Sequence, residues 1–286
     1  MKLHSEHVNP LPSSPRPILV GLPYDGSSSF QTGARLAPSA IRQALHSPAG
    51  NLWSEALVDL GAPGSLEDAG DLDLTQDSSA RPAIQTAIQR LASAGCAPIA
   101  LGGDHSVTFP ILAGLRPAWP KLHIVHLDAH PDLYDEFEGD RFSHACPFAR
   151  ILESGLADSL VQIGLRAVTG HQDDQARRFG VEQIDMRAWA EGKRPSLRAP
   201  IYLSVDLDGF DPAFAPGVSH SEPGGLAVRE VLTLIQHLPG PIAGADIVEL
   251  NPQRDLNDIT ARLGAKLVKE IASRMLRLAS PDLGAG

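Results

Sequence analysis

Cysteine is scarce in this chain of 286 residues, which contains only Cys96 and Cys146. The two form neither a CxxC pair nor part of a zinc-finger spacing. We therefore interpret both as reduced, partly buried thiols.

Long apolar segments are also missing. No run of about 18 or more apolar residues occurs, so we expect no transmembrane helix. The N-terminus lacks the apolar core of a signal peptide, and we expect a cytoplasmic protein. Four prolines among the first 17 residues indicate a flexible N-terminal arm over residues 1–16. Residues 17–286 are predicted to form a single domain, because no linker, internal repeat or low-complexity block is evident in them.

Positive charge is in the minority. The chain has 24 Lys and Arg against 34 Asp and Glu, which gives a formal net charge of -10. This balance argues against nucleic acid or an anionic membrane as a partner. A small cationic substrate is compatible with it. The hydrophobic content of 43% is enough for a sizeable buried core.

Apolar runs that are typical of strands alternate with helical patterns along the chain. We predict strands at residues 18–22, 56–60, 97–101, 122–127, 160–163, 181–184, 201–205 and 242–248. A helix is predicted over residues 83–94, between Pro82 and Gly95, and another where apolar residues recur every four positions from Ile259 to Met275. This alternation predicts an α/β fold, a three-layer αβα sandwich around a mostly parallel sheet of about eight strands.

The segment HLDAHPD, residues 126–132, follows one of these strands. It places Asp128, His130 and Asp132 at alternate positions, and in extended backbone such side chains point the same way. Asp and His together suit a divalent transition metal better than calcium or magnesium, which favour all-oxygen sites. The alternative is a polar loop that holds these residues by chance.

Two further predicted strands end in residues of the same kind. LSVDLDGFDP contains Asp206 and Asp208, and PIALGGDHS contains Asp104 and His105. In open parallel sheets, functional sites form outside the carboxyl ends of the strands. The three motifs are therefore predicted to build a single site.

Six side chains in these motifs are candidate metal ligands: His105, Asp128, His130, Asp132, Asp206 and Asp208. Six ligands are too many for one four-coordinate zinc ion, but they suit two divalent ions that share carboxylates. Two such ions would acidify a trapped water and so supply a nucleophile at neutral pH. The predicted reaction is hydrolysis at an electrophilic carbon or phosphorus.

Four blocks, GGDHS, DAHPD, SVDLDGFDP and DIVELNP, together resemble the signature blocks of the ureohydrolase family, which comprises arginases, agmatinases and related guanidino-group hydrolases. The resemblance extends from about Gly21 to Met275. FEGDRFSHACPFAR, RFGVEQ, DPAFAPGVSHSEPGGL and ELNPQRD are most similar to plant-type arginases and their bacterial relatives. The resemblance implies an arginase-like fold and cleavage of a guanidino group to urea and an amine.

The resemblance also implies roles for individual residues. One manganese ion would be held by His105, Asp128, Asp132 and Asp206, and a second by Asp128, His130, Asp206 and Asp208. Asp128 would in addition pass a proton to the leaving amine. His144 matches the family's active-site histidine, and Glu249 matches the carboxylate that pairs with the guanidinium; with Ser143 they are predicted to bind the substrate. Cobalt, nickel and iron are the alternatives to manganese, and the implied assembly is a homotrimer or homohexamer.

Substrate choice is predicted to depend on residues 133–143. An arginase must satisfy the α-carboxylate of arginine, whereas an agmatinase need not. This stretch holds four acidic residues and a single arginine, which would suit an amine-only substrate, yet the similarity to plant-type arginases favours arginine. We predict an arginase, with agmatinase as the first alternative, followed by guanidinobutyrase and formimidoylglutamase.

A two-metal phosphoesterase is a remote alternative, since it also uses Asp and His at strand ends. Such an enzyme needs basic side chains to hold phosphate, but the four blocks contain no lysine and no arginine before Arg254. A catalytically silent subunit would have lost a ligand. All six ligand positions, His144 and Glu249 are filled.

Several polar residues near the motifs have two open interpretations. His220 and Glu222 lie on a loop that either lines the mouth of the pocket or is simply solvated. Asp104 either orients the neighbouring imidazole or caps a loop. His123 and His126, which flank the predicted strand before Asp128, are interpreted as structural.

Overall fold

The computed structural model describes residues 15–279 of the chain. All eight strands of these residues belong to one sheet, in the order β2-β1-β3-β8-β7-β4-β5-β6, and every neighbouring pair is parallel. The strands are β1 (Arg16–Gly21), β2 (Glu67–Asp71), β3 (Cys96–Leu101), β4 (His123–Leu127), β5 (Ser159–Leu165), β6 (Glu182–Asp185), β7 (Ile201–Asp206) and β8 (Ile242–Val248). This is the predicted α/β fold.

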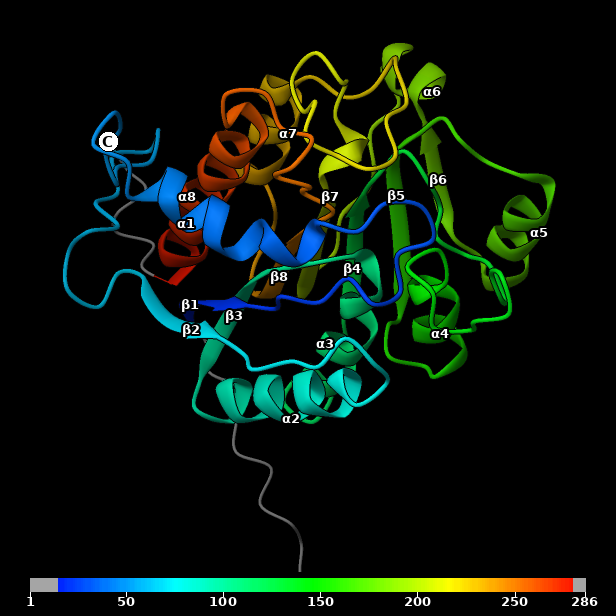
Figure 1. The fold of residues 1–286 in the computed structure, drawn as a ribbon, viewed down its shortest axis with the longest axis horizontal. Helices are drawn as coiled ribbons and strands as arrows, with labels where there is room; N and C mark the ends of the chain where they lie inside the picture. The colour runs from blue at the N-terminus through cyan, green and yellow to red at the C-terminus, as the bar shows by residue number, and fades with distance from the viewer. Residues whose placement is uncertain (1–14, 280–286) are drawn as a thin grey trace, which may run out of the picture.

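Helices cover both faces of the sheet (Figure 1). They are α1 (Ala37–Leu45), α2 (Ala80–Ser93), α3 (Thr108–Leu115), α4 (Pro147–Glu153), α5 (Gly170–Phe179), α6 (Met186–Ala190), α7 (Val228–Gln236) and α8 (Ile259–Ala279). α1, α7 and α8 pack together on one face, and α2, α3 and α4 on the other. Because both faces are covered, the central strands β3, β7 and β8 are buried along their whole length.

Alternate side chains of the strands enter two separate apolar clusters. Leu203 and Val205 of β7 join the cluster beneath α1, α7 and α8, whereas Tyr202 joins the cluster beneath α2, α3 and α4. Ser204 points to the same face as Tyr202 by the same alternation. This places a buried hydroxyl directly below the carboxyl end of β7.

The strand predicted at residues 56–60 is wrong. These residues form a loop, in which Trp53 and Asp59 pair in an isolated bridge and Leu60 is buried in the core. The second strand is instead β2, with the sequence EDAGD. β2 lies at the edge of the sheet, pairs only with β1 and is largely exposed. An exposed edge strand needs no apolar pattern, so the sequence gives it no strand signal.

The N-terminal arm predicted over residues 1–16 lies almost wholly outside the described residues. Its last residue, Arg16, already opens β1. Cys96 and Cys146 are both buried and free of disulfides. None of the helices within residues 15–279 is long and apolar enough to cross a membrane.

Candidate metal centre

The candidate ligands and Glu249 meet at the ends of four neighbouring strands. β3, β8, β7 and β4 are adjacent in the sheet. His105 begins the short 3-10 helix η2 (His105–Val107) after β3, Asp128 follows β4, and Asp206 ends β7. Glu249 follows β8. Since all four strands are parallel, their carboxyl ends share one edge, and Glu249 Oε1 accepts the backbone N–H of His105 at 2.8 Å.

Three carboxylate oxygens surround one ring nitrogen of His105. Its Nδ1 lies 3.0 Å from an oxygen of Asp132, 3.1 Å from one of Asp206 and 3.2 Å from one of Asp128. This nitrogen is buried and has no hydrogen-bond partner. Ligands at right angles around one ion, with bonds of about 2.1 Å, are about 3 Å apart. The four atoms therefore have the spacing of a shared coordination sphere.

The other ring nitrogen of His105 carries a proton, which leaves Nδ1 as the ring atom that can bind a cation. His105 Nε2 lies 2.9 Å from Ser204 Oγ, and the Ser204 hydroxyl donates to Asp246 Oδ1 at 2.7 Å. A hydroxyl has one proton, so Ser204 must accept from His105 Nε2–H. In the neutral ring, Nδ1 aims its lone pair at carboxylate oxygens, a repulsive arrangement that either a proton on Nδ1 or a metal ion between these atoms relieves. These residues fit a divalent metal ion.

A second group of ligand atoms adjoins the first through Asp128. His130 Nδ1 lies 3.4 Å from Asp128 Oδ1 and 3.2 Å from Asp208 Oδ2. Asp128 thus presents Oδ2 to the first group and Oδ1 to the second. Asp206 Oδ1 accepts the backbone N–H of Asp208 at 2.8 Å, which ties these two carboxylates together. The structure brings all six candidate side chains together, and their roles as individual ligands stay a prediction.

The centre concentrates buried negative charge. Burial, Asp208 and Asp128 raise the pKa of Asp206 well above its ordinary value, and burial and Asp128 raise the pKa of Asp208 to about 7. Burial alone would lower the pKa of His105, but the three carboxylates around it outweigh burial and raise this pKa well above its ordinary value. The shifts all favour bound positive charge, which metal ions would supply in place of protons.

Two residues of the site have strained backbone. Asp132 has φ of 50° and Glu249 has φ of 64°, a region that residues with a Cβ rarely adopt. Both are held by backbone hydrogen bonds, since Glu249 N–H donates to Gly103 O at 2.9 Å and Phe148 N–H donates to Asp132 O at 3.2 Å. The surrounding fold therefore maintains conformations that aim two acidic side chains at the centre.

His144 and Glu249 face each other beside the ligand groups. His144 Nδ1 lies 3.5 Å from Glu249 Oε1, and its Nε2 lies 2.8 Å from Ser29 Oγ. Burial alone would lower the pKa of His144, but Glu249 outweighs it and raises this pKa to about 9. Burial would likewise raise the pKa of Glu249, but His144 outweighs it and lowers this pKa. Glu249 is therefore kept as a carboxylate, the form that binds a cation.

A cavity of about 440 Å³ opens beside the centre. Part of its lining consists of His130, Asp132, His144, Asp206, Asp208 and Glu249. The remainder is mostly uncharged and includes Tyr134, Phe137, Val168, Thr169 and Gln172. The cavity thus joins a charged end to a wall of aromatic, aliphatic and neutral polar side chains.

Residues 133–143 shape this wall through aromatic rather than acidic side chains. Tyr134 and Phe137 line the cavity, but none of the four acidic residues of the stretch does. Asp135 instead accepts a hydrogen bond from Gln175 at 2.6 Å, and the two glutamates are exposed. The negative charge of the stretch is therefore directed away from the substrate space.

Ser143, which was predicted to bind the substrate, does not line the cavity; its Oγ accepts the backbone N–H of Ala145 at 3.4 Å. Ser29 and His220 do line it. The ring of His220 stacks on that of His144, with centroids 5.2 Å apart and planes inclined by 21°. Of the two interpretations of His220, the pocket-lining one holds. No pattern in the sequence marked Ser29.

Asp104 caps a loop and does not act through the imidazole beside it. Its Oδ1 accepts the backbone N–H of Ser106 at 3.1 Å, and its Oδ2 accepts that of Ser27 at 2.9 Å. The second bond ties the segment that carries Ser29 to the end of β3. Asp104 therefore helps to place the partner of His144.

Arg166 lines the cavity, but its donors are occupied by backbone carbonyls. Nε donates to Glu222 O at 2.9 Å, Nη1 to Gly164 O at 3.0 Å and Gly209 O at 3.1 Å, and Nη2 to Asp208 O at 2.7 Å. The side chain fastens the end of β5 to the segment that carries Asp208. It contributes positive charge to the cavity, but its N–H groups are not free to bind an anion.

The sequence profile of the arginase family matches residues 16–273, which is most of the chain. The chain belongs to the arginase family. This arginase-family chain is 40% identical to "Arginase 1, mitochondrial" of Arabidopsis thaliana over 275 residues, which cover 90% of this chain and 80% of that protein. It is 37% identical to the guanidinopropionase of Pseudomonas aeruginosa over 272 residues, which cover 88% of this chain and 84% of that protein.

A solved structure shows the same relationship. The arginase from Medicago truncatula matches this arginase-family chain with a TM-score of 0.87 at 40% identity, over 92% of this chain and 88% of that chain. The ureohydrolase resemblance and the arginase-like fold are thereby confirmed. As a family member, the chain is a hydrolase that acts on the C–N bond of a guanidino group.

The predicted cytoplasmic location is wrong. Two similar arginases of Arabidopsis thaliana are named as mitochondrial and as chloroplastic/mitochondrial, which points away from the cytoplasm. The prediction relied on the lack of an apolar signal core. Segments that direct proteins to mitochondria and chloroplasts are amphipathic and need no such core, so its absence had no bearing on these compartments.

Proposed function

We propose that the protein is a manganese-dependent arginase that hydrolyses L-arginine to L-ornithine and urea. The observation that supports this most is a single cavity in which Glu249, a buried carboxylate, adjoins two groups of His and Asp side chains. The similarity to arginases at 40% identity supports the same choice. The partner of the site is then a small cationic guanidino compound.

The metal ions would be held by side chains that already lie together. The first set is His105, Asp128, Asp132 and Asp206, and the second is Asp128, His130, Asp206 and Asp208. Two divalent ions bound there would lower the pKa of a water molecule and supply a nucleophile near neutral pH. We propose manganese as the resident ion. Cobalt, nickel and iron suit the same imidazole and carboxylate donors.

Glu249 binds the guanidinium in this proposal. A carboxylate can accept two parallel, charge-assisted hydrogen bonds from a planar guanidinium. The orientation of Glu249 is set before substrate arrives, because its Oε1 accepts the backbone N–H of His105 at 2.8 Å and lies 3.5 Å from His144 Nδ1. A fixed anchor of this kind holds the guanidinium carbon in one place, which is a large part of the expected rate gain.

Cleavage of the C–N bond requires a proton on the departing nitrogen. Asp132 lines the cavity and has an oxygen 3.0 Å from His105 Nδ1, whereas Asp128 is fully buried and does not line the cavity. We therefore propose Asp132, in place of the expected Asp128, as the group that takes a proton from the attacking water and delivers it to that nitrogen. His144 lies between Glu249 and Ser29 and is placed to exchange protons between the cavity and its surface. General acid–base steps of this kind contribute roughly 10²- to 10⁴-fold to rate.

The wall of the cavity favours arginine over agmatine. None of the four acidic residues in the stretch 133–143 lines the cavity, so the charge argument for an amine-only substrate no longer applies. Thr169 and Gln172 bring the start of α5 to the wall, where the positive end of the helix dipole favours a negatively charged group. Arg166 adds positive charge nearby but no hydrogen bond, because its N–H groups are bonded to backbone carbonyls. A tail that carries a carboxylate is better matched to this wall than an aminobutyl tail.

Another guanidino acid is the second candidate, since the same wall would accept any tail that bears a carboxylate. The 37% identity to a guanidinopropionase favours this candidate over the remaining ones. A phosphoesterase is disfavoured. The described residues that line the cavity include no lysine, and the guanidinium of Arg166 is bonded to backbone carbonyls.

A substrate panel tests the proposal. The protein is loaded with Mn²⁺, and kcat/KM for urea release is measured with L-arginine, agmatine, 3-guanidinopropionate and 4-guanidinobutyrate, and for formamide release with formiminoglutamate. We expect the highest value with L-arginine. A higher value with another guanidino compound would reassign the substrate, and no product from any of them would reject the proposed activity.

A further inference from the structure

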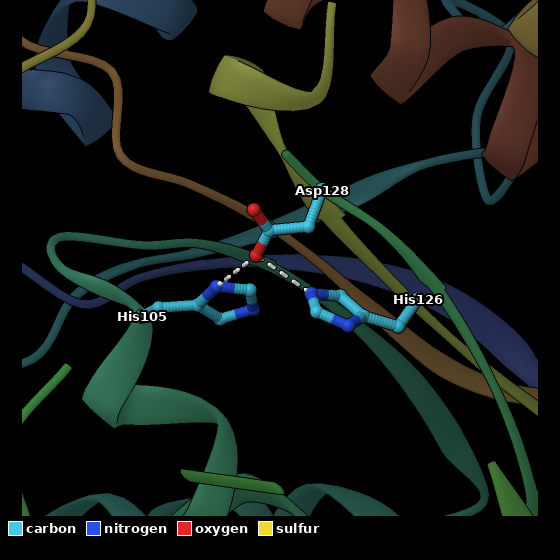
Figure 2. A group of neighbouring side chains, drawn as sticks. All are labelled: His105, His126 and Asp128. Carbon is cyan, nitrogen blue, oxygen red and sulfur yellow. Dashed lines mark hydrogen bonds and ion pairs between the residues drawn. The ribbon is translucent and has the colours of Figure 1, made fainter. Parts of the chain in front are cut away.

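His126 is a buried histidine that neither proposed ligand set uses. It lies on β4, two residues before Asp128, and is fully buried. Its Nε2 lies 2.8 Å from Asp128 Oδ2, the oxygen that also faces His105 (Figure 2). The three side chains His105, His126 and Asp128 are close enough to hold an ion together. His126 is therefore either a metal ligand or a hydrogen-bond donor to Asp128, and its protonation decides which.

Gln162 on β5 fixes where the ring proton of His126 lies. The amide Nε2 of Gln162 donates to Pro131 O at 2.6 Å, and a carbonyl oxygen can only accept, so the orientation of this amide is determined. Its Oε1 accepts from Gln183 Nε2 at 2.9 Å. The same Gln162 Nε2 lies 3.0 Å from His126 Nδ1 and therefore donates its second proton there. Nδ1 of His126 must be the unprotonated nitrogen.

We propose that His126 is a positioning residue, held neutral with its proton on Nε2, which donates to Asp128 Oδ2 and fixes the carboxylate that bridges the two ligand groups. A protonated Nε2 has no lone pair, so His126 cannot bind a metal ion through it. The other oxygen, Asp128 Oδ1, accepts the backbone N–H of His130 at 2.6 Å. Each oxygen of Asp128 thus has one fixed donor and keeps its remaining lone pair for the centre.

The rings around His126 exclude water from its hydrogen bond to Asp128 and hold the imidazole in one orientation. Phe148 packs on His126 with ring centroids 4.0 Å apart, and the His105 ring meets it edge-on at 5.0 Å. All three side chains are fully buried. A hydrogen bond to a carboxylate is strongest where water is excluded. Loss of a donor of this kind to a metal ligand typically costs about 10- to 100-fold in metal affinity.

The inference rests on the proposed dinuclear centre, and a comparison of metal binding tests it. Mn²⁺ binding is measured by equilibrium dialysis and elemental analysis for the wild type, His126→Phe and His123→Phe. The control, His123, is a partly buried histidine on the same strand whose Nδ1 pairs with Ser159 Oγ at 2.8 Å, away from the centre. We expect His126→Phe to weaken the binding of at least one Mn²⁺ ion about 10- to 100-fold and His123→Phe to leave it unchanged.

A second variant guards against failure of His126→Phe to fold. Gln162→Leu keeps the imidazole but removes the amide that selects its tautomer, and we expect it to weaken Mn²⁺ binding as well, by a smaller factor. Wild-type affinity in both His126→Phe and Gln162→Leu would overturn the proposal. If the wild type itself binds no Mn²⁺, it is the proposed function that fails, so the two failures are distinguishable.

The tautomer can be observed directly. The protein is labelled with ¹⁵N-histidine and loaded with Zn²⁺, a diamagnetic ion, and the ring ¹⁵N shifts show which nitrogen carries the proton. The signal of His126 is identified by its absence from a His126→Gln variant. We expect protonated Nε2 and unprotonated Nδ1. Unprotonated Nε2 in the loaded protein would overturn the proposal, because His126 would then be a ligand itself.

Discussion

Glu249 is the residue on which recognition of the guanidinium depends. It is a buried carboxylate on strained backbone, held by Gly103 and His105 and facing His144. A buried carboxylate without a cation is costly, and His144 offsets that cost when no substrate is bound. A guanidinium can take over this role of His144, which makes substrate binding an exchange of one positive partner for another.

We predict that Glu249→Gln raises KM for L-arginine about 10- to 100-fold, since the variant loses a charge-assisted bond of about 1.5–3 kcal/mol. Steady-state urea release measures KM and kcat. Glu222→Gln is the control, because Glu222 is an exposed carboxylate near the cavity that does not line it. Equal KM values in Glu249→Gln and the wild type would show that Glu249 has a structural role only.

The ligand-type residues at the strand ends were predictable because extended backbone fixes the spacing of side chains that share a direction. Asp128, His130 and Asp132 follow that spacing, and the structure brings them together. Ser29 and His220 were not predictable as a pair, since each reaches His144 from a loop. A single serine or histidine in a loop has no periodic pattern that would mark its destination.

At the level of elements, the close approach of two loops places His105. A Cβ on Gly103 would lie 1.5 Å from Tyr24 O, so only glycine allows the turn after β3 to lie against the turn after β1. The next residue, Asp104, donates its backbone N–H to Tyr24 O at 2.9 Å. The position of η2, and with it the first ligand group, depends on this contact.

We therefore predict that Gly103→Ala lowers the free energy of unfolding by about 1–3 kcal/mol through overpacking and also weakens Mn²⁺ binding. Gly170→Ala is the matched control, because a Cβ there meets nothing within 4 Å and lies at the start of α5, where alanine changes stability by about 1 kcal/mol or less. Urea denaturation and Mn²⁺ titration check both variants. Similar behaviour of the two alanine variants would contradict the close-approach argument.

A buried carboxylate on α8 joins that helix to α7 and to the loop before β2. Glu270 Oε1 accepts from Lys266 Nζ at 2.6 Å and from the backbone N–H of Glu55 at 2.9 Å, and its Oε2 accepts from Gln236 Nε2 at 3.1 Å. Burial alone would raise the pKa of Glu270, but these partners outweigh it and lower the pKa below its ordinary value of 4.5. The folded state therefore prefers the ionised form.

The lowered pKa of Glu270 in the folded state determines how its contribution to stability changes with pH. A carboxyl whose pKa is lower in the folded than in the unfolded state stabilises the fold above its unfolded pKa, and the contribution is lost as the pH falls through the folded value. We predict that Glu270→Gln lowers Tm at pH 7 and that the difference from the wild type shrinks below about pH 4. Exposed Glu182→Gln serves as the control. A constant difference at all pH values would contradict the assignment.

The elements themselves were predicted unevenly, for a physical reason. Buried strands such as β7 and β8 need apolar residues on both faces, so they leave long apolar runs that the sequence shows. The edge strand β2 is held by backbone pairing with β1 and is mostly exposed, so its side chains are free to be acidic. The apolar residues at 56–60 pack from a loop, where burial occurs without a strand.

For the whole molecule, the centre couples metal binding to stability. The described core carries four neighbouring carboxylates with two imidazoles, and without ions this charge is only partly balanced. Ions that bind the folded chain alone stabilise it, by about 2.7 kcal/mol for each site at a concentration 100-fold above Kd. Folding and metal loading are therefore linked.

We predict that removal of metal with EDTA lowers Tm by several degrees or more and that added Mn²⁺ restores it. Differential scanning calorimetry measures both states. Asp128→Asn, in which one oxygen of the bridging carboxylate becomes an amide, should show a much smaller response to Mn²⁺. A wild-type Tm that is the same with EDTA and with Mn²⁺ would contradict the link.

The oligomeric state is a second property of the whole molecule. The homotrimer or homohexamer implied by the resemblance stays a prediction, and sedimentation of the Mn²⁺-loaded protein measures it. The centre is built from residues of one chain, since the carboxyl ends of β3, β4, β7 and β8 and the segments directly after them supply the six proposed ligands and Glu249. We therefore expect both groups of metal ligands to form within each subunit separately.

The central claim is that side chains at the strand ends of one chain would hold two metal ions and that the guanidino group is cleaved at this centre. It is tested most directly by titrating metal-free protein with Mn²⁺ and measuring the rate of urea release from L-arginine against the number of ions bound per chain. We predict that the rate rises to its plateau at two ions per chain. A full rate at one ion or none, or no urea at two, would contradict the account.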